Sequence, residues 1–292
     1  MSQFSARAID PAQTDALLEV VTQQITLMTF DEADEEMLGR LVGCLADPRE
    51  GAQMALASTF GEIGEAATGI LVAGLLGHPI ALARRGCGRS LAKVRDPDAI
   101  PGLIQALLMD SDPRVKSAVA SALVAIGEPA IPALLDVIAS EVGMTETGHA
   151  ACALAHMDDE ALPAFYGAID SPVGAVRCAV VAATCAVLKA HGGVDERAIA
   201  LIVVALGDLD PMVRTEAATA IGNIPLRVEV EKLLVTLADP VEDVRQAAAI
   251  ALGRLGDRKA IEFLERAAAS DVSNSVRILA ALAIGAIGEE AP

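Results

Sequence analysis

Four basic residues stand close together in one short segment of an otherwise acidic sequence: Arg84, Arg85, Arg89 and Lys93. If residues 80–94 form a helix, Arg85 and Arg89 lie four residues apart on its solvent-facing side, with Arg84 and Lys93 beside them. A guanidinium group can bind a carboxylate through two parallel hydrogen bonds. The segment therefore predicts a site for an anion or for an acidic, carboxylate-bearing partner. The alternative is a solvated basic face that only neutralises neighbouring acidic repeats.

A second group of residues could ligate a metal. His149, Cys152 and His156 are spaced as i, i+3 and i+7, which places them in one stripe of a helix, and Cys178 and Cys185 share a face further along. Imidazole and thiolate are ligands of zinc and neighbours of iron–sulfur clusters. However, residues seven apart are separated by about 10 Å along a helix. We therefore expect no metal site, and we place His149, Cys152, His156 and Cys178 among the contacts of a concave face.

The common catalytic motifs are absent from the sequence. It contains no glycine-rich phosphate loop, no nucleophile elbow and no His-Glu-x-x-His motif. None of the four histidines precedes a glutamate, so the His-Glu pairs of a di-iron hydroxylase are missing too. No catalytic residue is predicted.

The composition restricts the class of partner. The formal net charge is −18 and only 2% of the residues are aromatic, which argues against a nucleic-acid-binding surface. The sequence has neither a signal-peptide pattern nor a long uncharged apolar stretch, so we expect no membrane span. Five cysteines without regular spacing suit reduced thiols. We expect a cytoplasmic, helix-rich protein without a bound cofactor.

A repeat of roughly 30 residues organises the chain. Asp112-Pro113, Asp210-Pro211 and Asp239-Pro240 each begin a copy, and Val-Arg or Val-Lys follows within a few residues. An aspartate caps a helix, proline is tolerated in the first turn, and a glycine such as Gly256 ends the helix. Each copy is therefore predicted to be a pair of helices, of which the second carries the Val-Arg dipeptide.

About eight helix pairs are predicted, after an N-terminal capping helix within residues 1–33. Because no pair can bury its apolar face alone, the pairs must stack, which predicts an all-α fold, an α-solenoid over residues 34–292 as a single continuous domain. The longest connection is expected at His191-Gly192-Gly193. The second helices are expected at residues 49–63, 80–94, 114–126, 146–156, 173–189, 212–222, 242–255 and 274–287.

One position recurs in these second helices, and we call it the ladder position. Arg177, Arg214 and Arg245 occupy it in three successive copies. We expect these arginines to pair with the aspartates of the turns, and each pair would contribute about 0.2–1 kcal/mol if exposed. The ladder position is occupied in the other copies by Gln53, Arg84, Lys116, Thr147 and Arg277.

The recurring Asp-Pro, Val-Arg, Ala-Leu and Gly pattern resembles the HEAT-repeat superfamily, in particular the short repeat named after phycobilisome lyases. The resemblance covers roughly residues 40–290. Two segments, Gly148-His-Ala-Ala-Cys-Ala-Leu-Ala155 and Val176-Arg-Cys-Ala-Val-Val181, are similar to cyanobacterial members. Those members include bilin lyases, phycobilisome-disassembly factors and proteins that bind iron–sulfur assembly scaffolds. The same repeat occurs in proteins without a connection to bilins.

Three functions are compatible with these observations. The first is a non-catalytic protein-binding scaffold or chaperone, which the resemblance connects with phycobiliprotein assembly or turnover. The second is a bilin lyase or lyase subunit that attaches a tetrapyrrole to cysteine, although Tyr166 and five phenylalanines offer few aromatic walls for a bilin. The third is an iron–sulfur assembly partner that uses His149, Cys152, Cys178 and Cys185.

Overall fold

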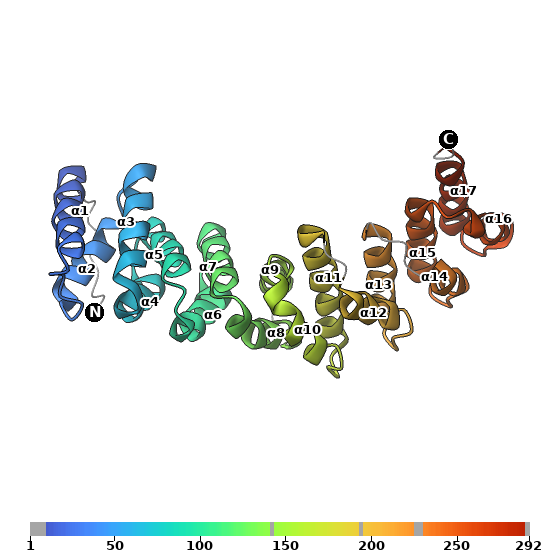
Figure 1. Ribbon diagram of the computed structural model, residues 1–292, viewed down its shortest axis with the longest axis horizontal. Coiled ribbons are helices and arrows are strands. Elements are labelled where there is room, and N and C mark those ends of the chain that lie inside the picture. The colour runs from blue at the N-terminus through green and yellow to red at the C-terminus, as the bar shows by residue number, and fades with distance from the viewer. Residues whose placement is uncertain (1–9, 141–142, 193–194, 225–229, 290–292) are drawn as a thin grey trace. The chain divides into compact units, whose positions relative to one another are not determined.

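A computed structural model describes residues 10–140, 143–192, 195–224 and 230–289. Within these residues the fold is all-α and contains no strand (Figure 1). The chain divides into two compact units, Met1–Ala153 (unit 1) and Leu154–Pro292 (unit 2), and each is described by itself. The prediction of an all-α solenoid is confirmed.

The described residues contain eight successive helix pairs after the first helix, α1 (Pro11–Thr26), which is shorter than the predicted cap. The first helices of the pairs are α2 (Glu35–Cys44), α4 (Thr68–Gly77), α6 (Ile100–Met109), α8 (Ile131–Ala139), α10 (Leu162–Ala168), α12 (Glu196–Ala205), α14 (Val230–Thr236) and α16 (Ile261–Ser270). Short 3₁₀ turns lead into several of them, at Gly64–Ala67, Pro97–Ala99, Glu128–Ala130, Asp159–Ala161 and Arg258–Ala260.

The second helices lie where the repeat pattern predicted them, with boundaries that differ by two residues or fewer. They are α3 (Glu50–Ile63), α5 (Ala81–Val94), α7 (Pro113–Ile126), α9 (Met144–Ala155), α11 (Gly174–His191), α13 (Pro211–Asn223), α15 (Glu242–Leu255) and α17 (Asn274–Glu289).

Local signals set these boundaries. The carboxylate of Asp112 accepts a hydrogen bond from the backbone N–H of Arg114 at 2.8 Å, and Pro113 occupies the first turn of α7. Asp210 caps α13 in the same way, with a 2.9 Å bond from the N–H of Met212. At the other end of a second helix, Gly256 adopts the left-handed conformation (φ 68°), which glycine reaches without a Cβ clash.

Unit 1 consists of two layers of helices (Figure 1). In one layer the second helices α3, α5 and α7 lie side by side, and α1 packs against α3 at the start of this row. In the other layer α2, α4, α6 and α8 follow one another. The core between the layers contains fully buried leucines from both rows, such as Leu71 of α4 and Leu91 of α5.

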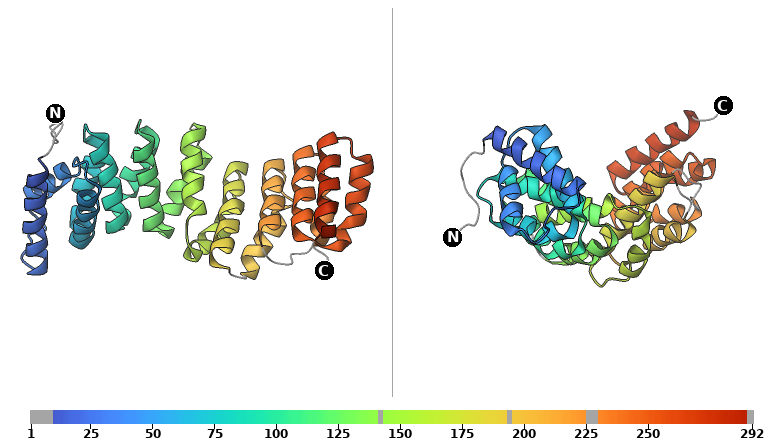
Figure 2. Two further views of the ribbon diagram at one scale, coloured as in Figure 1. Left: turned by 90° about the horizontal axis from the view of Figure 1, so that it is seen from above. Right: turned by 60° about the vertical axis from the view of Figure 1, so that its left-hand side comes forward.

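Unit 2 repeats this arrangement. Its second helices α11, α13, α15 and α17 form one row, and each of the first helices α10, α12, α14 and α16 packs on the second helix of its own pair (Figure 2). Leu252 of α15 is fully buried, as its place in the repeat predicted. Small residues such as Ala218 and Ala248 are also fully buried, which lets neighbouring second helices approach closely.

Two described segments are long and apolar enough to cross a membrane by length and composition alone: residues 50–77 and 174–191. The first is not a single helix, because Gly64, with φ at 76°, separates α3 from the 3₁₀ turn that leads into α4. The second is α11, which packs between α10, α12 and α13. Both segments are built into the packed layers of their units.

Two local predictions were wrong. His191 is the last residue of α11 rather than part of a loop, and Gly192 ends the helix in the left-handed conformation, while Gly193 lies outside the described residues. His156 lies in the turn after α9, because this helix ends at Ala155. The predicted stripe of His149, Cys152 and His156 is therefore not carried by one helix.

Candidate partner-binding site

The basic segment forms helix α5, and its side chains line a groove on the second-helix layer of unit 1. The groove has a volume of about 740 Å³ and is bordered by α3, α5 and α7. We call it the cationic groove. The larger charged and apolar side chains of its lining are Glu50, Met54, Arg85, Arg89, Lys93 and Arg114, and its small side chains include Ser58, Ser117 and Ser121.

Close packing of α5 against both neighbouring repeats positions the groove. A Cβ atom on Gly86 would lie 2.9 Å from Cβ of Leu45, and one on Gly88 would lie 3.2 Å from Cβ of Ala118. A side chain at Gly86 would therefore require Leu45 to move, and one at Gly88 would be a tight contact with Ala118. The two glycines each cost the helix about 1 kcal/mol relative to alanine. Because they let α5 pack closely against its neighbours, Arg85 and Arg89 line the same groove as side chains of α3 and α7.

Arg84 and Arg85 are adjacent in sequence but have different surroundings. Arg84 occupies the ladder position and binds Asp110 through two hydrogen bonds of 2.7 and 3.0 Å, with a third to the carbonyl of His78. These bonds to Asp110 raise the pKa of Arg84 further, so the guanidinium stays charged. Arg84 was predicted as part of the partner site, but its side chain is engaged in joining two repeats.

The other three predicted residues are arranged differently. Arg85 and Arg89 are half-buried rather than fully exposed, and Lys93 is exposed. Among the described residues, no carboxylate lies within ion-pair distance of these three side chains or of Arg114, which the sequence analysis did not single out. Glu50 is the one acidic residue of the lining. The groove thus gathers four cations, none of which is paired with a carboxylate in the described part of the chain.

The ladder that the repeat predicted is confirmed in unit 2. Arg177 binds Asp208 through bonds of 2.7 and 2.6 Å. Arg214 binds Asp239 at 2.7 and 3.0 Å. The pair of Arg245 and Asp271 has the same form, with bonds of 2.9 and 3.0 Å.

These pairs are mostly buried, so they serve packing rather than recognition. The side chains of Arg245 and Asp271 are each only 9% exposed. The hydrogen bond from Arg245 outweighs the effect of burial and lowers the pKa of Asp271. Removing either partner would leave a largely desolvated charge, which is costly.

The predicted concave-face residues do not form a cluster that could bind a metal. His149 is half-buried, and one of its ring nitrogens lies 2.6 Å from the carbonyl of Thr145. Cys152 and His156 are exposed, and Cys178 is half-buried on α11. No group of three or more His, Cys, Asp or Glu side chains is arranged to hold a metal ion in the described part of the chain.

Burial keeps several thiols protonated. It raises the pKa of Cys178 to about 11, and the nearby carboxylates of Glu216 and Asp210 add to this effect. The pKa of Cys185 is raised for the same main reason. Since the thiolate is both the nucleophile and the metal ligand, these two side chains are poorly suited to either role at neutral pH.

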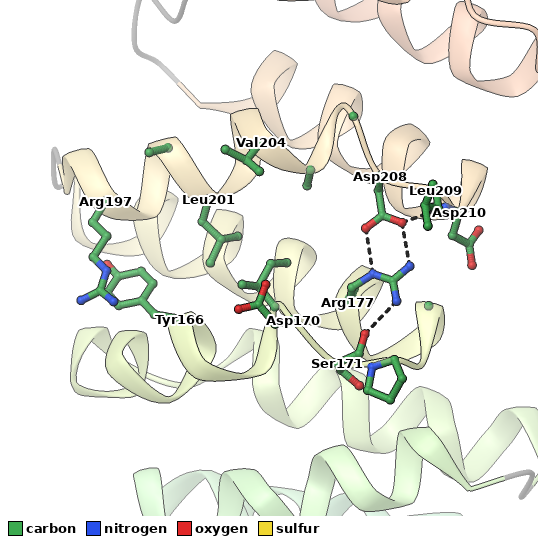
Figure 3. A pocket seen from close by; sticks show the side chains of 16 residues that line it. Tyr166, Asp170, Ser171, Arg177, Arg197, Leu201, Val204, Asp208, Leu209 and Asp210 are labelled. Carbon is green, nitrogen blue, oxygen red and sulfur yellow. Dashed lines mark hydrogen bonds and ion pairs between the residues drawn. The ribbon is translucent and has the colours of Figure 1, made fainter.

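Sequence reasoning missed a pocket in unit 2 (Figure 3). It has a volume of about 980 Å³ and lies between α10 and α12, beside the turns that lead into α11 and α13. Leu201, Val204 and Leu209 form apolar walls, and the ion pair of Arg177 and Asp208 closes one end. The repeat pattern gave no signal for it, because most of its lining comes from the first helices α10 and α12 and from turns, and only Gly174 and Arg177 belong to the second helix α11.

Tyr166 and Arg197 lie at the other end of this pocket (Figure 3). The guanidinium carbon of Arg197 lies 4.2 Å from the centre of the Tyr166 ring, which is a cation–π contact. Burial and the nearby Asp195 carboxylate raise the pKa of Tyr166 to about 12, so the phenol stays protonated at neutral pH. The only tyrosine of the sequence is therefore a neutral part of the pocket wall.

Comparisons with known proteins agree with this architecture. HEAT repeats are matched over residues 69–144 and 230–292. A comparison with curated proteins finds no match. Among solved structures, the complex of CpcE and CpcF of phycocyanin lyase from Nostoc sp. PCC7120 is 26% identical, with 53% of this chain and 97% of that chain covered and a TM-score of 0.46.

A larger protein has the same fold at lower sequence identity. Kap121p bound to Nup53p is 14% identical, with 96% of this chain and 38% of that chain covered and a TM-score of 0.56. Kap121p bound to the extreme C-terminus of the protein phosphatase Cdc14p is 15% identical, with the same coverage and TM-score. These structures share the all-α solenoid fold of this chain, and the family match identifies HEAT repeats within residues 69–144 and 230–292.

Proposed function

We propose that this chain is a non-catalytic protein-binding scaffold that holds an acidic, carboxylate-bearing segment of a partner protein in the cationic groove. The observation that carries the proposal is the set of four groove cations, which have no carboxylate partner within the residues that the structure describes, in a chain of net charge −18. By contrast, the ladder arginines Arg84, Arg177, Arg214 and Arg245 are each bound to an aspartate.

The lining of the groove suits a peptide segment. Arg85 and Arg89 can each bind a carboxylate through two bonds, and their half-burial limits competition from water. Met54 is 61% exposed and offers a flexible apolar contact beside the charged side chains. The acidic remainder of the chain repels acidic segments, so capture is favoured only at the groove.

The test uses the full-length chain and a fluorescent oligoglutamate peptide, with binding followed by fluorescence anisotropy. Replacing both Arg85 and Arg89 with Glu should weaken binding by about tenfold or more and remove most of its salt dependence. The melting temperature should stay nearly unchanged, because neither side chain joins two repeats.

A matched control separates the groove from general electrostatics. Arg40 and Arg258 are exposed, lie outside the groove, and have no ion pair among the described residues. Replacing both with Glu changes the net charge by the same amount as the groove variant. If the two double variants bind the peptide equally well, the groove is not the site and the proposal fails.

A narrower partner class is phycobiliproteins, in whose assembly or turnover the scaffold would act in the cytoplasm. It is supported by the sequence resemblance of the repeats alone. Mixing the chain with an apo-phycobiliprotein and free bilin tests it by visible absorption. A partner role predicts binding of the phycobiliprotein without bilin attachment, and the Arg85 and Arg89 variant should lose that binding.

A further inference from the structure

The junctions between successive second helices of unit 2 follow one rule. In each junction one residue of a helix touches one residue of the next helix. The first residue lies eight positions after the ladder residue of its own helix, and the second lies six positions after the ladder residue of the next helix. In the two junctions where the first residue is glycine, a Cβ added to it would lie 2.8 and 2.9 Å from the alanine Cβ, so the helices touch there. In the third, a cysteine Sγ lies 3.6 Å from an alanine carbonyl. The three pairs are Cys185–Ala220, Gly222–Ala251 and Gly253–Ala283.

The next helix of the row, α17, presents the same surface, and no other helix of the described residues packs on it. Gly285 occupies the position of Gly222 and Gly253, and no atom lies within 4 Å of a Cβ placed there. Ala281 is exposed, whereas its counterpart Ala249 on α15 is fully buried. We call the side chains of Ile278, Ala281, Leu282 and Gly285 the end face.

The end face is apolar as well as uncovered. Ile278 is 52% exposed and Leu282 is 64% exposed, whereas Ile250, the counterpart of Leu282 on α15, is 39% exposed. An exposed apolar patch of this kind on a helix marks an interaction surface. The helix α1 differs, because the side chains that it exposes include the polar Gln13, Glu19 and Gln23, with Val20 46% exposed among them.

Arg277 adds a charge to this surface. Its Nη1 donates to the carbonyl of Asp271 at 2.6 Å, which holds the guanidinium as in the preceding ladder arginines. Arg177, Arg214 and Arg245 then bind an aspartate of the following repeat. For Arg277 no carboxylate among the described residues takes that place, and its Nη2 donates to the amide oxygen of Asn274 at 3.1 Å.

We propose that the end face binds the end face of a second copy of this chain in a two-fold symmetric dimer. This inference does not depend on the cationic groove. Ala281 and Gly285 lie one helical turn apart, so two antiparallel α17 helices can cross closely there while Ile278 and Leu282 pack on either side. The pairing is self-complementary, as a two-fold interface requires.

Charge supports the antiparallel arrangement. If two copies of α17 cross near Leu282, Arg277 of one copy lies beside the last helical turn of the other. The unpaired carbonyls of a helix C-terminus carry partial negative charge, which stabilises a nearby cation. The α17 helix has no basic residue in its own last turn, so this position is open to Arg277 of the other copy. The polar surface of α1 disfavours the alternative, a head-to-tail chain of copies.

Sedimentation equilibrium of the full-length chain over a wide concentration range tests the proposal. We expect a reversible monomer–dimer equilibrium. Replacing Leu282 with Glu should raise the dimer dissociation constant by about tenfold or more, because it introduces a charge at the centre of an apolar interface. Val235 is 75% exposed on α14 of the same unit, so Val235→Glu is a matched control that should leave the equilibrium unchanged.

A second variant separates dimerisation from folding. Gly285→Leu finds open space in the single chain and replaces a poor helix former, so its melting temperature should be unchanged or higher. It should nevertheless weaken the dimer, because the close crossing is blocked. Gly69→Leu, at another open helical glycine, is the control. A chain that stays monomeric at all concentrations, forms open-ended polymers, or dimerises equally well with both end-face variants overturns the proposal.

Discussion

The second helices of the two units use their cations differently. In unit 2, Arg177, Arg214 and Arg245 are all bound to aspartates of the next repeat. In unit 1 the arginine at the ladder position, Arg84, is bound in the same way, but Arg85 directly follows it and has no carboxylate partner in the described residues. The arginines that recur at the ladder position in unit 2 therefore join repeats, whereas Arg85, which follows that position in one repeat, lines the cationic groove.

The geometry of a helix explains the difference. Successive residues are rotated by about 100°, so the ladder residue points toward the neighbouring turn while the following residue points into the groove. In unit 2 the residues that follow the ladder arginines are Cys178, Thr215 and Gln246, which are uncharged. Four measurements test this difference between the two units.

Leu252→Ala should have the largest effect, a destabilisation of about 2–5 kcal/mol, because Leu252 is fully buried between layers of unit 2. In a repeat array this loss should act on nearby repeats first. Hydrogen exchange should show faster opening of α15 and α17 and little change in α3 and α5. Equal loss of protection in both units would contradict the local character of the packing.

Arg84→Gln and Arg85→Gln test adjacent residues with opposite roles. The first should lower the free energy of unfolding by about 1–3 kcal/mol, because the largely buried Asp110 carboxylate loses its partner. The second should change it by less than about 0.5 kcal/mol. Urea unfolding measures both. Similar losses for the two variants would mean that Arg85 is also part of the ladder.

Asp271→Asn tests the ladder of unit 2 through its pH dependence. The hydrogen bond from Arg245 is the main cause of the lowered pKa of Asp271. A lowered pKa in the folded state stabilises the protein above the ordinary pKa of Asp, about 3.9, and this stabilisation is lost as the pH falls through the folded-state pKa. The variant should therefore be less stable than the native chain at pH 7, and the difference should shrink toward pH 2. A constant difference at all pH values would argue against a charged pair.

Glu216→Gln should have the smallest effect and the opposite sign. Burial in unit 2 raises the pKa of Glu216. A raised pKa means that the folded state is favoured below the ordinary pKa of Glu, about 4.3, and that this advantage is lost as the pH rises through the folded-state pKa. The variant should melt at a slightly higher temperature than the native chain at pH 7 and at nearly the same temperature at pH 4. A lower melting temperature at pH 7 would show that the ionised carboxylate is stabilising.

The sequence predicted the helix that carries the candidate site, but it did not predict the full set of residues that line the groove. The segment 80–94 was expected to be a basic helix with Arg85 and Arg89 on one side, and α5 has this form. Arg114 was missed because it belongs to the next repeat, 29 positions after Arg85 in the sequence. The pocket beside Tyr166 was missed because its walls come from two first helices that no single repeat unit describes.

The sequence by itself determined the helices, their pairing and the ladder. Asp-Pro caps, glycine ends and apolar periodicity act within one or two turns of the chain, so their free energies are local and recur in each copy. Which cations have counter-ions and where His156 lies relative to α9 were known only from the tertiary structure. The same holds for the glycines of the second helices: Gly222 and Gly253 are covered by the next helix, whereas Gly285 is not covered by any described residue. Those outcomes depend on contacts between residues about 30 positions apart in neighbouring repeats, and such contacts form only when the repeats stack.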